Sequence, residues 1–318
     1  MPNLLITRPL PEPVLEAARA AYEVTVRDSN VPMSVADCAE ALRGYDAILP
    51  TLRDQFTAEA FAGEGLRCKL LANFGVGYNH IDVAAAQAAG ISVTNTPGAV
   101  TDATADIAMT LILMTARRAG EGERMLRAGQ WEGWHPTQLL GHHVTGSRLG
   151  VIGMGRIGKA IAKRCHFGFD MEVVFYNRSE VRDPGLPARQ LGSIAEVMGV
   201  ADVVVVAVPA NPQTHHLINA EAFAAMKPTG LFVNIARGDI VEEAALIAAL
   251  QAGQIAGAGL DVYEFEPEVP EALKALENVT LLPHLGTAAL NVRTEMGLMA
   301  VENLLAHARG EKLPNRVG

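Results

Sequence analysis

The 318-residue sequence has few cysteines, few aromatic residues and no concentrated positive charge. Its three cysteines, Cys38, Cys68 and Cys165, have no CxxC spacing, which argues against a disulfide framework and a thiolate metal site. Lys and Arg total 26 against 35 Asp and Glu, so the net charge is −9, and no Lys/Arg-rich run is present. We therefore expect no nucleic-acid partner.

Long apolar runs are also missing. The longest apolar segment, residues 107–114, contains Thr110 and is too short to span a bilayer. No basic stretch followed by a long apolar one stands at the N-terminus. The composition, 49% hydrophobic and 19% charged, is that of a chain with a large core. We expect a cytoplasmic protein without a membrane partner, folded as one or two domains.

Short aliphatic runs alternate with alanine-rich helical stretches along most of the chain, which predicts βα units and parallel sheets. The expected strands of the first third are residues 4–7, 24–26, 47–49, 69–72 and 91–94, with helices between them such as 13–21 and 35–42. The middle of the chain has six more, at residues 149–152, 172–176, 203–208, 231–235, 256–260 and 279–282. Six is the number in a complete dinucleotide-binding sheet.

Local signals mark several helix ends. Ser193 and Asn219 are candidate N-caps, and Gly230 and Gly253 are candidate stops. Two longer helical stretches, residues 101–118 and 287–307, do not fit the alternation. We predict two α/β domains, the second inserted into the first, with residues 1–98 plus 287–318 in one and 99–286 in the other.

The sharpest motif is Gly153-Met154-Gly155-Arg156-Ile157-Gly158, after an expected strand and at the start of an expected helix. In this pattern Gly153 allows a tight turn, Gly155 lets a pyrophosphate approach the backbone, and Gly158 lets helix and strand pack closely. The helix N-terminus supplies free N–H groups to the phosphates. The alternative is a glycine-rich turn without a ligand, but the flanking strand and helix favour dinucleotide binding.

Polar residues follow three of the middle strands where those strands end. Arg237, Asp261 and His284 should gather on the sheet edge where ligands bind. Each residue also has a purely structural interpretation: Arg237 as a surface charge, Asp261 as a helix cap and His284 as a loop histidine. A carboxylate beside a histidine favours the imidazolium ion, and Glu264, Glu266 and Glu268 are all close enough in sequence to serve.

The other histidines point to no metal site. His142-His143 and His215-His216 are adjacent pairs, whose side chains tend to diverge on an extended backbone, and HExxH is absent. No GxSxG elbow is present. Trp131 and Trp134 are typical of interface or core aromatics.

The sequence resembles the D-isomer-specific 2-hydroxyacid dehydrogenases over nearly its whole length. The resemblance rests on NFGVGYNHID (73–82), NTPGAVTDATADIAMTLIL (95–113), LGVIGMGRIG (149–158), NIARGDIV (234–241), LDVYEFEP (260–267) and PHLGTA (283–288). The TDATAD and GQWEGWHP segments are most similar to the glyoxylate/hydroxypyruvate reductase branch. The family resemblance implies a dinucleotide-binding Rossmann domain that is inserted in a flavodoxin-like substrate domain. Each of the two domains is expected to contain a doubly wound parallel sheet.

The resemblance also implies residue roles. Arg237 matches the arginine that binds the substrate carboxylate, His284 the acid/base, and Glu266 its carboxylate partner. Val76 and Gly77 match a loop whose N–H groups face the carboxylate. Asp261 matches the residue that orients the nicotinamide carboxamide, while Thr104 and Ala236 match cofactor-lining positions. The family is typically homodimeric through residues 101–118 and 131–141, and Trp134 matches a tryptophan that reaches the neighbouring pocket.

For the coenzyme, the acid that selects NAD near the end of the second strand is missing, and Asn177-Arg178-Ser179 stands there instead. A guanidinium can bind a 2′-phosphate through paired donors, so Arg178 predicts a preference for NADP over NAD. The nearby carboxylates of Glu180 and Asp183 weaken the positive potential around Arg178. The residues expected to line the cofactor are Thr104, Gly153, Gly155, Arg156, Ile157, Gly158, Asn177, Arg178, Ser179, Val208, Pro209, Thr214, Ile235, Ala236, Arg237, Asp261, His284 and Gly286.

The predicted activity is NAD(P)H-dependent reduction of glyoxylate or hydroxypyruvate to the D-2-hydroxy acid. The alternatives are a dehydrogenase for larger 2-oxo acids, a cofactor-sensing binding protein on the same fold, and a formate dehydrogenase, a branch that typically has a glutamine where Glu266 stands.

Overall fold

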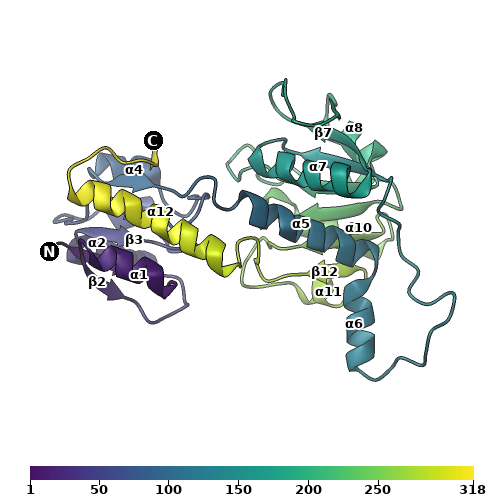
Figure 1. Ribbon diagram of the computed structural model, residues 1–318, viewed down its shortest axis with the longest axis horizontal. Helices are drawn as coiled ribbons and strands as arrows, with labels where there is room; N and C mark the ends of the chain where they lie inside the picture. Colours follow the sequence, from purple (N-terminus) through teal and green to yellow (C-terminus); the bar gives the residue numbers. More distant parts are fainter. The chain divides into compact units, whose positions relative to one another are not determined.

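A computed structural model describes residues 1–318, and the chain divides into two compact units. Unit 1 consists of Met1–Val100 and Ala288–Gly318, and unit 2 of Thr101–Thr287, so unit 2 is inserted into unit 1 (Figure 1). The predicted fold class, two α/β units built on parallel sheets, is confirmed. No helix is both long enough and apolar enough to cross a membrane.

The sheet of unit 1 has the order β13-β5-β4-β3-β1-β2. Strands β1 to β5 are parallel and follow the 2-1-3-4-5 order of flavodoxin-like sheets. The short β13 pairs antiparallel with β5 at the edge, and the sequence did not predict it. The strands are β1 (Asn3–Ile6), β2 (Glu23–Val26), β3 (Ala47–Leu49), β4 (Leu70–Ala72), β5 (Ser92–Thr94) and β13 (Arg316–Val317).

The side chains of alternate residues in these strands are buried on opposite faces of the unit 1 sheet. Leu4 and Ile6 pack with α1 (Glu12–Arg19) and α12 (Leu290–Ala308), which lie side by side in Figure 1. Leu5 packs on the other face. That face is covered by α2 (Val35–Gly44), α3 (Ala58–Phe61) and α4 (Val83–Ala88).

The sheet of unit 2 is entirely parallel, in the order β12-β11-β10-β9-β6-β7-β8. Its first six strands have the 3-2-1-4-5-6 order of the dinucleotide-binding fold, and β12 adds a seventh. The polar edge strand β8 was not predicted. The strands are β6 (Arg148–Ile152), β7 (Glu172–Tyr176), β8 (Ala188–Gln190), β9 (Val203–Val206), β10 (Leu231–Asn234), β11 (Gly257–Leu260) and β12 (Val279–Leu281).

Both faces of this sheet are covered, as its uninterrupted apolar strands require. In β9, Val203 and Val205 pack under α5 (Thr101–Ala116) and α7 (Arg156–Phe169). Val204 and Val206 face the other side of the sheet. That side is covered by α8 (Ile194–Val200), α9 (Ala220–Ala224) and α10 (Glu243–Gln251). The remaining elements of unit 2 are α6 (Ala119–Arg127), the 3₁₀ turn η1 (Gly238–Ile240) and α11 (Glu271–Lys274).

Three of the four predicted helix-end signals are confirmed. The side chains of Ser193 and Asn219 accept the N3 backbone N–H groups of α8 and α9. Gly253, with φ of +64°, follows the end of α10 in the left-handed conformation that glycine favours. The prediction for Gly230 is wrong, because α9 already ends at Ala224 and Gly230 lies in a turn before β10.

Candidate functional site

The glycine-rich turn joins β6 to α7 at the carboxyl edge of the unit 2 sheet. Gly153 has φ of +101°, and a Cβ there would lie 2.8 Å from the Ala207 carbonyl oxygen. A Cβ on Gly158 would lie 2.1 Å from the Gly153 carbonyl oxygen. Both glycines are therefore needed for close packing of the turn.

Gly155 differs, because a Cβ there would meet nothing within 4 Å. It is the N-cap of α7, and the space beside it faces the free N–H groups of the first helical turn. A pyrophosphate fits this space, with the helix dipole favouring its negative charge. The turn therefore fits a dinucleotide.

The loop after β7 carries the residues predicted to select the coenzyme. Gln190 holds this loop by donating through Nε2 to the carbonyl oxygens of Asn177 and Ser179, both at 3.1 Å. Arg178 is exposed. The nearby carboxylate of Glu180 pairs with Arg182 at 3.6 Å rather than with Arg178.

His284 and Glu266 lie side by side after β12 and β11. Nδ1 of His284 is 3.0 Å from Oε2 of Glu266, so of the three candidate carboxylates Glu266 contacts the histidine. Both side chains are largely buried, with 29% and 18% exposure. His284 has φ of +54°, a strained conformation that is concentrated at functional sites.

Tyr263 fixes the two loops relative to each other. Its N–H donates to Oε1 of Glu266 at 3.0 Å, and its hydroxyl donates to the Leu282 carbonyl oxygen at 2.9 Å. The tyrosine is 8% exposed, and burial raises the pKa of its hydroxyl. The His284 imidazole and the Glu266 carboxylate are thus held in one orientation.

Arg237 follows β10 on a loop packed against the Tyr263 loop. A Cβ on Gly238 would lie 1.8 Å from the Tyr263 carbonyl carbon, so only glycine allows this approach. Burial lowers the pKa of the Arg237 guanidinium, while the charges of Glu266 and Asp239 raise it. An arginine stays charged in such a setting, so the site holds a desolvated cation ready for an anion. Asn234 keeps the turn by donating to the Arg237 carbonyl oxygen at 2.9 Å.

Asp261 is 1% exposed and organises the backbone after His284. Its carboxylate accepts the N–H groups of Leu285 at 2.6 Å and Gly286 at 2.8 Å. Burial raises the pKa of this carboxyl, and the Leu285 bond is the main opposing effect. Thr104 of α5 donates to the Gly286 carbonyl oxygen at 3.3 Å, which brings this cofactor-lining candidate to the same turn.

The remaining cofactor-lining candidates follow neighbouring strands of the same edge. Val208, Pro209 and Thr214 come after β9, where the Thr214 hydroxyl donates to the Pro209 carbonyl oxygen at 2.8 Å. Ile235 and Ala236 come directly after β10. All the predicted cofactor residues lie in unit 2, at or beside the carboxyl ends of its strands.

Val76 and Gly77 lie in unit 1, in the loop after β4. Asn73 donates through Nδ2 to the carbonyl oxygens of Gly75 and Gly77, and Asn95 to that of Val76. The N–H groups of Val76 and Gly77 donate to no acceptor in the chain. The loop thus presents two free backbone donors.

Sequence reasoning overlooked four residues that hold these loops: Asn73, Asn95, Asn234 and Tyr263. A signal was available for the asparagines, because each directly follows a strand or ends one and begins a glycine-containing motif.

The adjacent pair His215-His216 contradicts the expectation that the two side chains diverge. The rings stack with centroids 3.9 Å apart, because His216 has φ of +50° and the backbone is not extended there. Trp131 and Trp134 are 53% and 80% exposed, so neither is a core residue of this chain.

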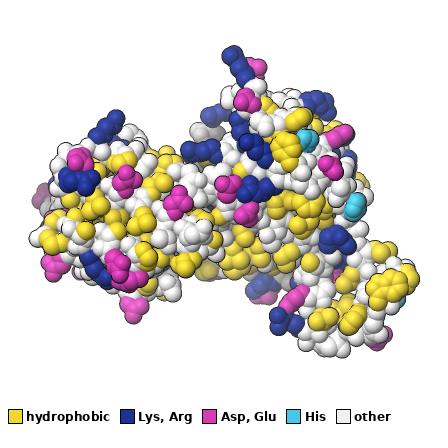
Figure 2. Space-filling view, viewed as in Figure 1, with side chains coloured by type: hydrophobic (Ala, Val, Ile, Leu, Met, Phe, Trp, Pro, Cys, Tyr) yellow, Lys and Arg dark blue, Asp and Glu magenta, His cyan; other side chains and the backbone are white.

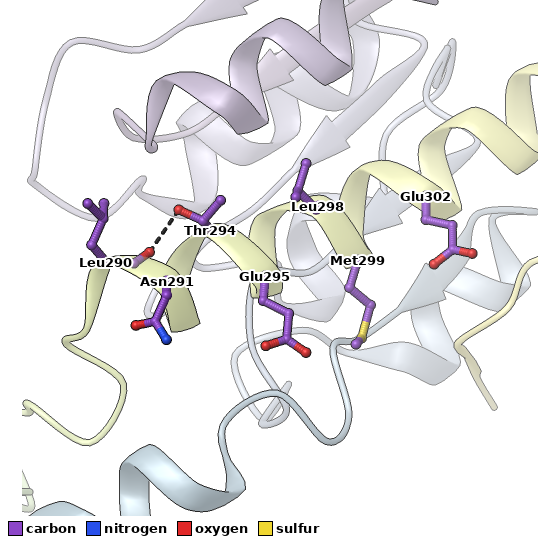
Figure 3. A pocket seen from close by; sticks show the side chains of 7 residues that line it. All are labelled: Leu290, Asn291, Thr294, Glu295, Leu298, Met299 and Glu302. Atoms are coloured by element: carbon purple, nitrogen blue, oxygen red, sulfur yellow. Dashed lines mark hydrogen bonds between the residues drawn. The ribbon is translucent and has the colours of Figure 1, made fainter.

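A separate groove lies along α12 of unit 1, and Figure 3 shows its lining side chains on one helix. Two of them are the carboxylates Glu295 and Glu302, and none is a cation. The groove therefore offers no positive charge to hold a phosphate or a carboxylate. It is lined by Leu290, Asn291, Thr294, Glu295, Leu298, Met299 and Glu302.

The unit 2 sheet order, the glycine turn and the His–Glu pair at its carboxyl edge define an α/β oxidoreductase that uses a nicotinamide dinucleotide. Comparison with known proteins gives the family. Residues 109–286 match the model of the D-isomer specific 2-hydroxyacid dehydrogenase NAD binding domain.

Relatives match over the full chain. A glyoxylate reductase of Thermococcus onnurineus is 41% identical, covering 99% of this chain and 96% of the relative. A glycerate dehydrogenase of Hyphomicrobium methylovorum is 36% identical, covering 94% and 93%. The crystal structure of an NADPH-dependent glyoxylate/hydroxypyruvate reductase of Sinorhizobium meliloti, with NADP and malonate, superposes with a TM-score of 0.88 at 34% identity, covering 100% and 97%. The chain belongs to the D-isomer specific 2-hydroxyacid dehydrogenase family.

Proposed function

We propose that the protein reduces glyoxylate or hydroxypyruvate to the D-2-hydroxy acid, glycolate or D-glycerate, with NADPH as the preferred coenzyme. The observation that supports this most directly is the 3.0 Å contact of His284 with Glu266, beside the Arg237 loop. The names of the relatives support the small substrate, since they include glyoxylate reductases and a glycerate dehydrogenase.

In this proposal each polar side chain has a defined role. The bound coenzyme supplies a hydride to the carbonyl carbon of the substrate. His284 donates a proton to the carbonyl oxygen, and Glu266 stabilises the imidazolium that must be present beforehand. Arg237 binds the substrate carboxylate and stabilises the charge that grows on the oxygen. We assign Asp261 to the orientation of the nicotinamide carboxamide.

We assign unit 2 to the dinucleotide and unit 1 to the substrate. The predicted boundaries, 1–98 plus 287–318 and 99–286, differ by two residues or fewer from the compact units. The free N–H groups of Val76 and Gly77 support the assignment, because they suit a substrate carboxylate.

The preference for NADPH rests on Arg178. Glu180 is engaged by Arg182, so the guanidinium of Arg178 is available to a 2′-phosphate. The test compares kcat/KM for NADPH and NADH in the wild type and in Arg178→Ala. We expect the wild type to favour NADPH and the variant to lose most of that ratio; preference for NADH, or an unchanged ratio, would contradict the proposal.

We also propose a homodimer in the cytoplasm. Leu126, Trp131, Trp134 and Leu140 are all more than half exposed, and Figure 2 shows hydrophobic side chains gathered over the α6 region of unit 2. Such a patch is typical of an interface, where Trp134 would reach the pocket of the second copy. The three cysteines are free and buried, which suits a reducing compartment. Sedimentation of the wild type and of Trp131→Glu tests the dimer.

The activity is tested by following coenzyme oxidation with glyoxylate, hydroxypyruvate and phenylpyruvate. We expect the highest kcat/KM with the first two. A preference for phenylpyruvate would indicate a dehydrogenase for larger 2-oxo acids. Coenzyme binding without turnover of any acid would indicate a cofactor-sensing protein, and reduction of NAD⁺ by formate would indicate a formate dehydrogenase.

A further inference from the structure

Three potential metal ligands meet on unit 2 outside the residues assigned to catalysis. His215 and His216 lie between β9 and α9, and Glu264 lies in the loop after β11. One nitrogen of each histidine and one carboxylate oxygen of Glu264 all lie within 4.8 Å of one another. Nε2 of His216 is 2.7 Å from Oε1 of Glu264.

The backbone holds this cluster in place. The left-handed conformation of His216 turns its ring back onto that of His215, with an angle of 26° between the ring planes. The His216 N–H donates to the Asp239 carbonyl oxygen at 2.9 Å, and Ile218 forms a bridge to Val241. The histidines therefore belong to an ordered segment that packs beside the Arg237 loop.

The chemistry of the donors selects a class of ion. Two imidazoles and one carboxylate suit zinc and neighbouring divalent transition metals, and they are poor ligands for the hard ions magnesium and calcium. In a tetrahedral site with bonds near 2.0–2.1 Å, donors lie about 3.3 Å apart. The 2.7 Å separation of His216 and Glu264 reaches that value through a small side-chain movement.

We propose that His215, His216 and Glu264 bind one divalent transition-metal ion, with zinc as the reference ion. The ion takes the place of the hydrogen in the His216–Glu264 hydrogen bond, and the exposed His215 ring rotates out of the stack to become the third ligand. His215 is exposed, so water completes the coordination and the ion enters from solvent. The alternative is a simple His216–Glu264 ion pair, in which His215 has no role.

The site is distinct from the catalytic pair but lies on the same loop. Glu264 is two residues from Glu266, and its N–H lies 3.4 Å from Oε2 of Glu243. A bound ion would connect the segment after β9 to the loop that positions Glu266. We therefore expect the ion to raise the melting temperature of the protein, because it binds the folded chain in preference to the unfolded one.

The test is calorimetric titration of zinc chloride into the full-length protein after treatment with a chelator. We expect one ion per chain for the wild type. His215→Ala should weaken the affinity at least about tenfold, the range typical of disturbed metal sites. Because His215 is exposed and stacks only on its neighbour, this variant keeps the His216–Glu264 pair.

Two further variants make the result decisive. Glu264→Gln removes the charged ligand but keeps an oxygen acceptor for His216, and it should weaken zinc to a similar degree. His143→Ala removes an exposed histidine from the other adjacent pair and should bind zinc like the wild type. The proposal is overturned if the wild type takes up no zinc, if His215→Ala and Glu264→Gln bind it unchanged, or if His143→Ala loses as much.

Discussion

At the scale of single residues, Tyr263 contacts both loops that carry the proposed catalytic pair, His284 and Glu266. Its backbone N–H holds Glu266, and its hydroxyl holds the carbonyl group two residues before His284. The position of the segment before His284 therefore depends on a buried phenol, and that of Glu266 on the backbone of the same residue.

Tyr263→Phe should lower stability by about 0.5–1.5 kcal/mol, the net contribution of one hydrogen bond, because the Leu282 carbonyl group loses its donor. We expect a lower kcat with an almost unchanged coenzyme Kd. Chemical denaturation and steady-state kinetics measure the two effects. Tyr45→Phe is the matched control, and equal losses in both variants would refute the role of Tyr263.

His284→Ala should reduce kcat with glyoxylate by about 10²–10⁴-fold, the usual contribution of a general acid. Coenzyme binding, followed by fluorescence, should remain. Because His284 has a positive φ, His284→Asn is the companion variant, since asparagine tolerates this conformation. Turnover near that of the wild type in either variant would show that another group supplies the proton.

Glu243→Gln should raise the melting temperature at pH 8. Burial, together with the charge of Glu264, raises the pKa of the Glu243 carboxyl above its unfolded value. Ionisation therefore costs stability as the pH rises through the folded-state pKa, and the glutamine avoids this cost. The gain should shrink towards pH 4, where both states are protonated. Glu16→Gln, on an exposed carboxylate, is the matched control for the loss of one negative charge.

The positions of Arg237, Asp261 and His284 at one edge of the sheet could be predicted, because each follows the end of a strand in a parallel sheet. The choice of Glu266 could not be made from spacing alone and came from the family resemblance. The stacked histidines could not be predicted either, because one φ angle at His216 decides where the rings go.

At the scale of elements, two glycines of the turn between β6 and α7 have different roles: Gly158 allows close packing, and Gly155 leaves space for a ligand. Gly158→Ala would place a Cβ 2.1 Å from a backbone oxygen, and overpacking of this kind costs about 1–3 kcal/mol or more. Gly155→Ala meets open space, and its N-cap position limits the cost to about 1 kcal/mol.

The two variants should therefore lose different properties, one its thermal stability and the other its affinity for the coenzyme. Gly158→Ala should lower the melting temperature clearly. Gly155→Ala should fold like the wild type but bind NADPH more weakly, because its methyl group occupies the space for the pyrophosphate. Thermal denaturation without coenzyme, and a binding titration, distinguish these outcomes. Normal coenzyme affinity in Gly155→Ala would place the phosphates elsewhere.

Most strands could be predicted because they are buried on both faces and appear as aliphatic runs. The two that were missed lie at sheet edges: β8 has the sequence Ala-Arg-Gln, and β13 has only two residues. Neither contains an aliphatic run, and each depends on a neighbouring strand for its conformation. The prediction for Gly230 fails because, in sequence alone, a turn glycine before a strand resembles a helix stop.

At the scale of the whole molecule, unit 1 is built from both ends of the chain. The core between its sheet and α1 includes Ala300, Val301 and Leu304 of α12. The Tyr22 hydroxyl donates to the Leu304 carbonyl oxygen at 2.9 Å, and Gly297 leaves room for Val14. The unit therefore has no complete core without the last 31 residues.

In a chain that ends at residue 287, unit 2 should stay folded, whereas unit 1 should lack a complete core and remain unfolded or partly folded. Limited proteolysis measures this directly, with cleavage expected within residues 1–100 and protection within 101–287. The full-length chain under the same protease is the control. Equal protection of both segments would mean that unit 1 closes its core without α12.

This arrangement has a consequence for synthesis on the ribosome. The first 100 residues emerge early, but the helix that completes their core is translated only after the whole of unit 2. At about 5–20 residues per second, the intervening 187 residues (101 to 287) take roughly 10–40 s. Throughout that interval the nascent segment exposes the apolar surface that α12 later covers, and it is then most open to chaperones and to aggregation. The part of the enzyme made first is the part that finishes folding last.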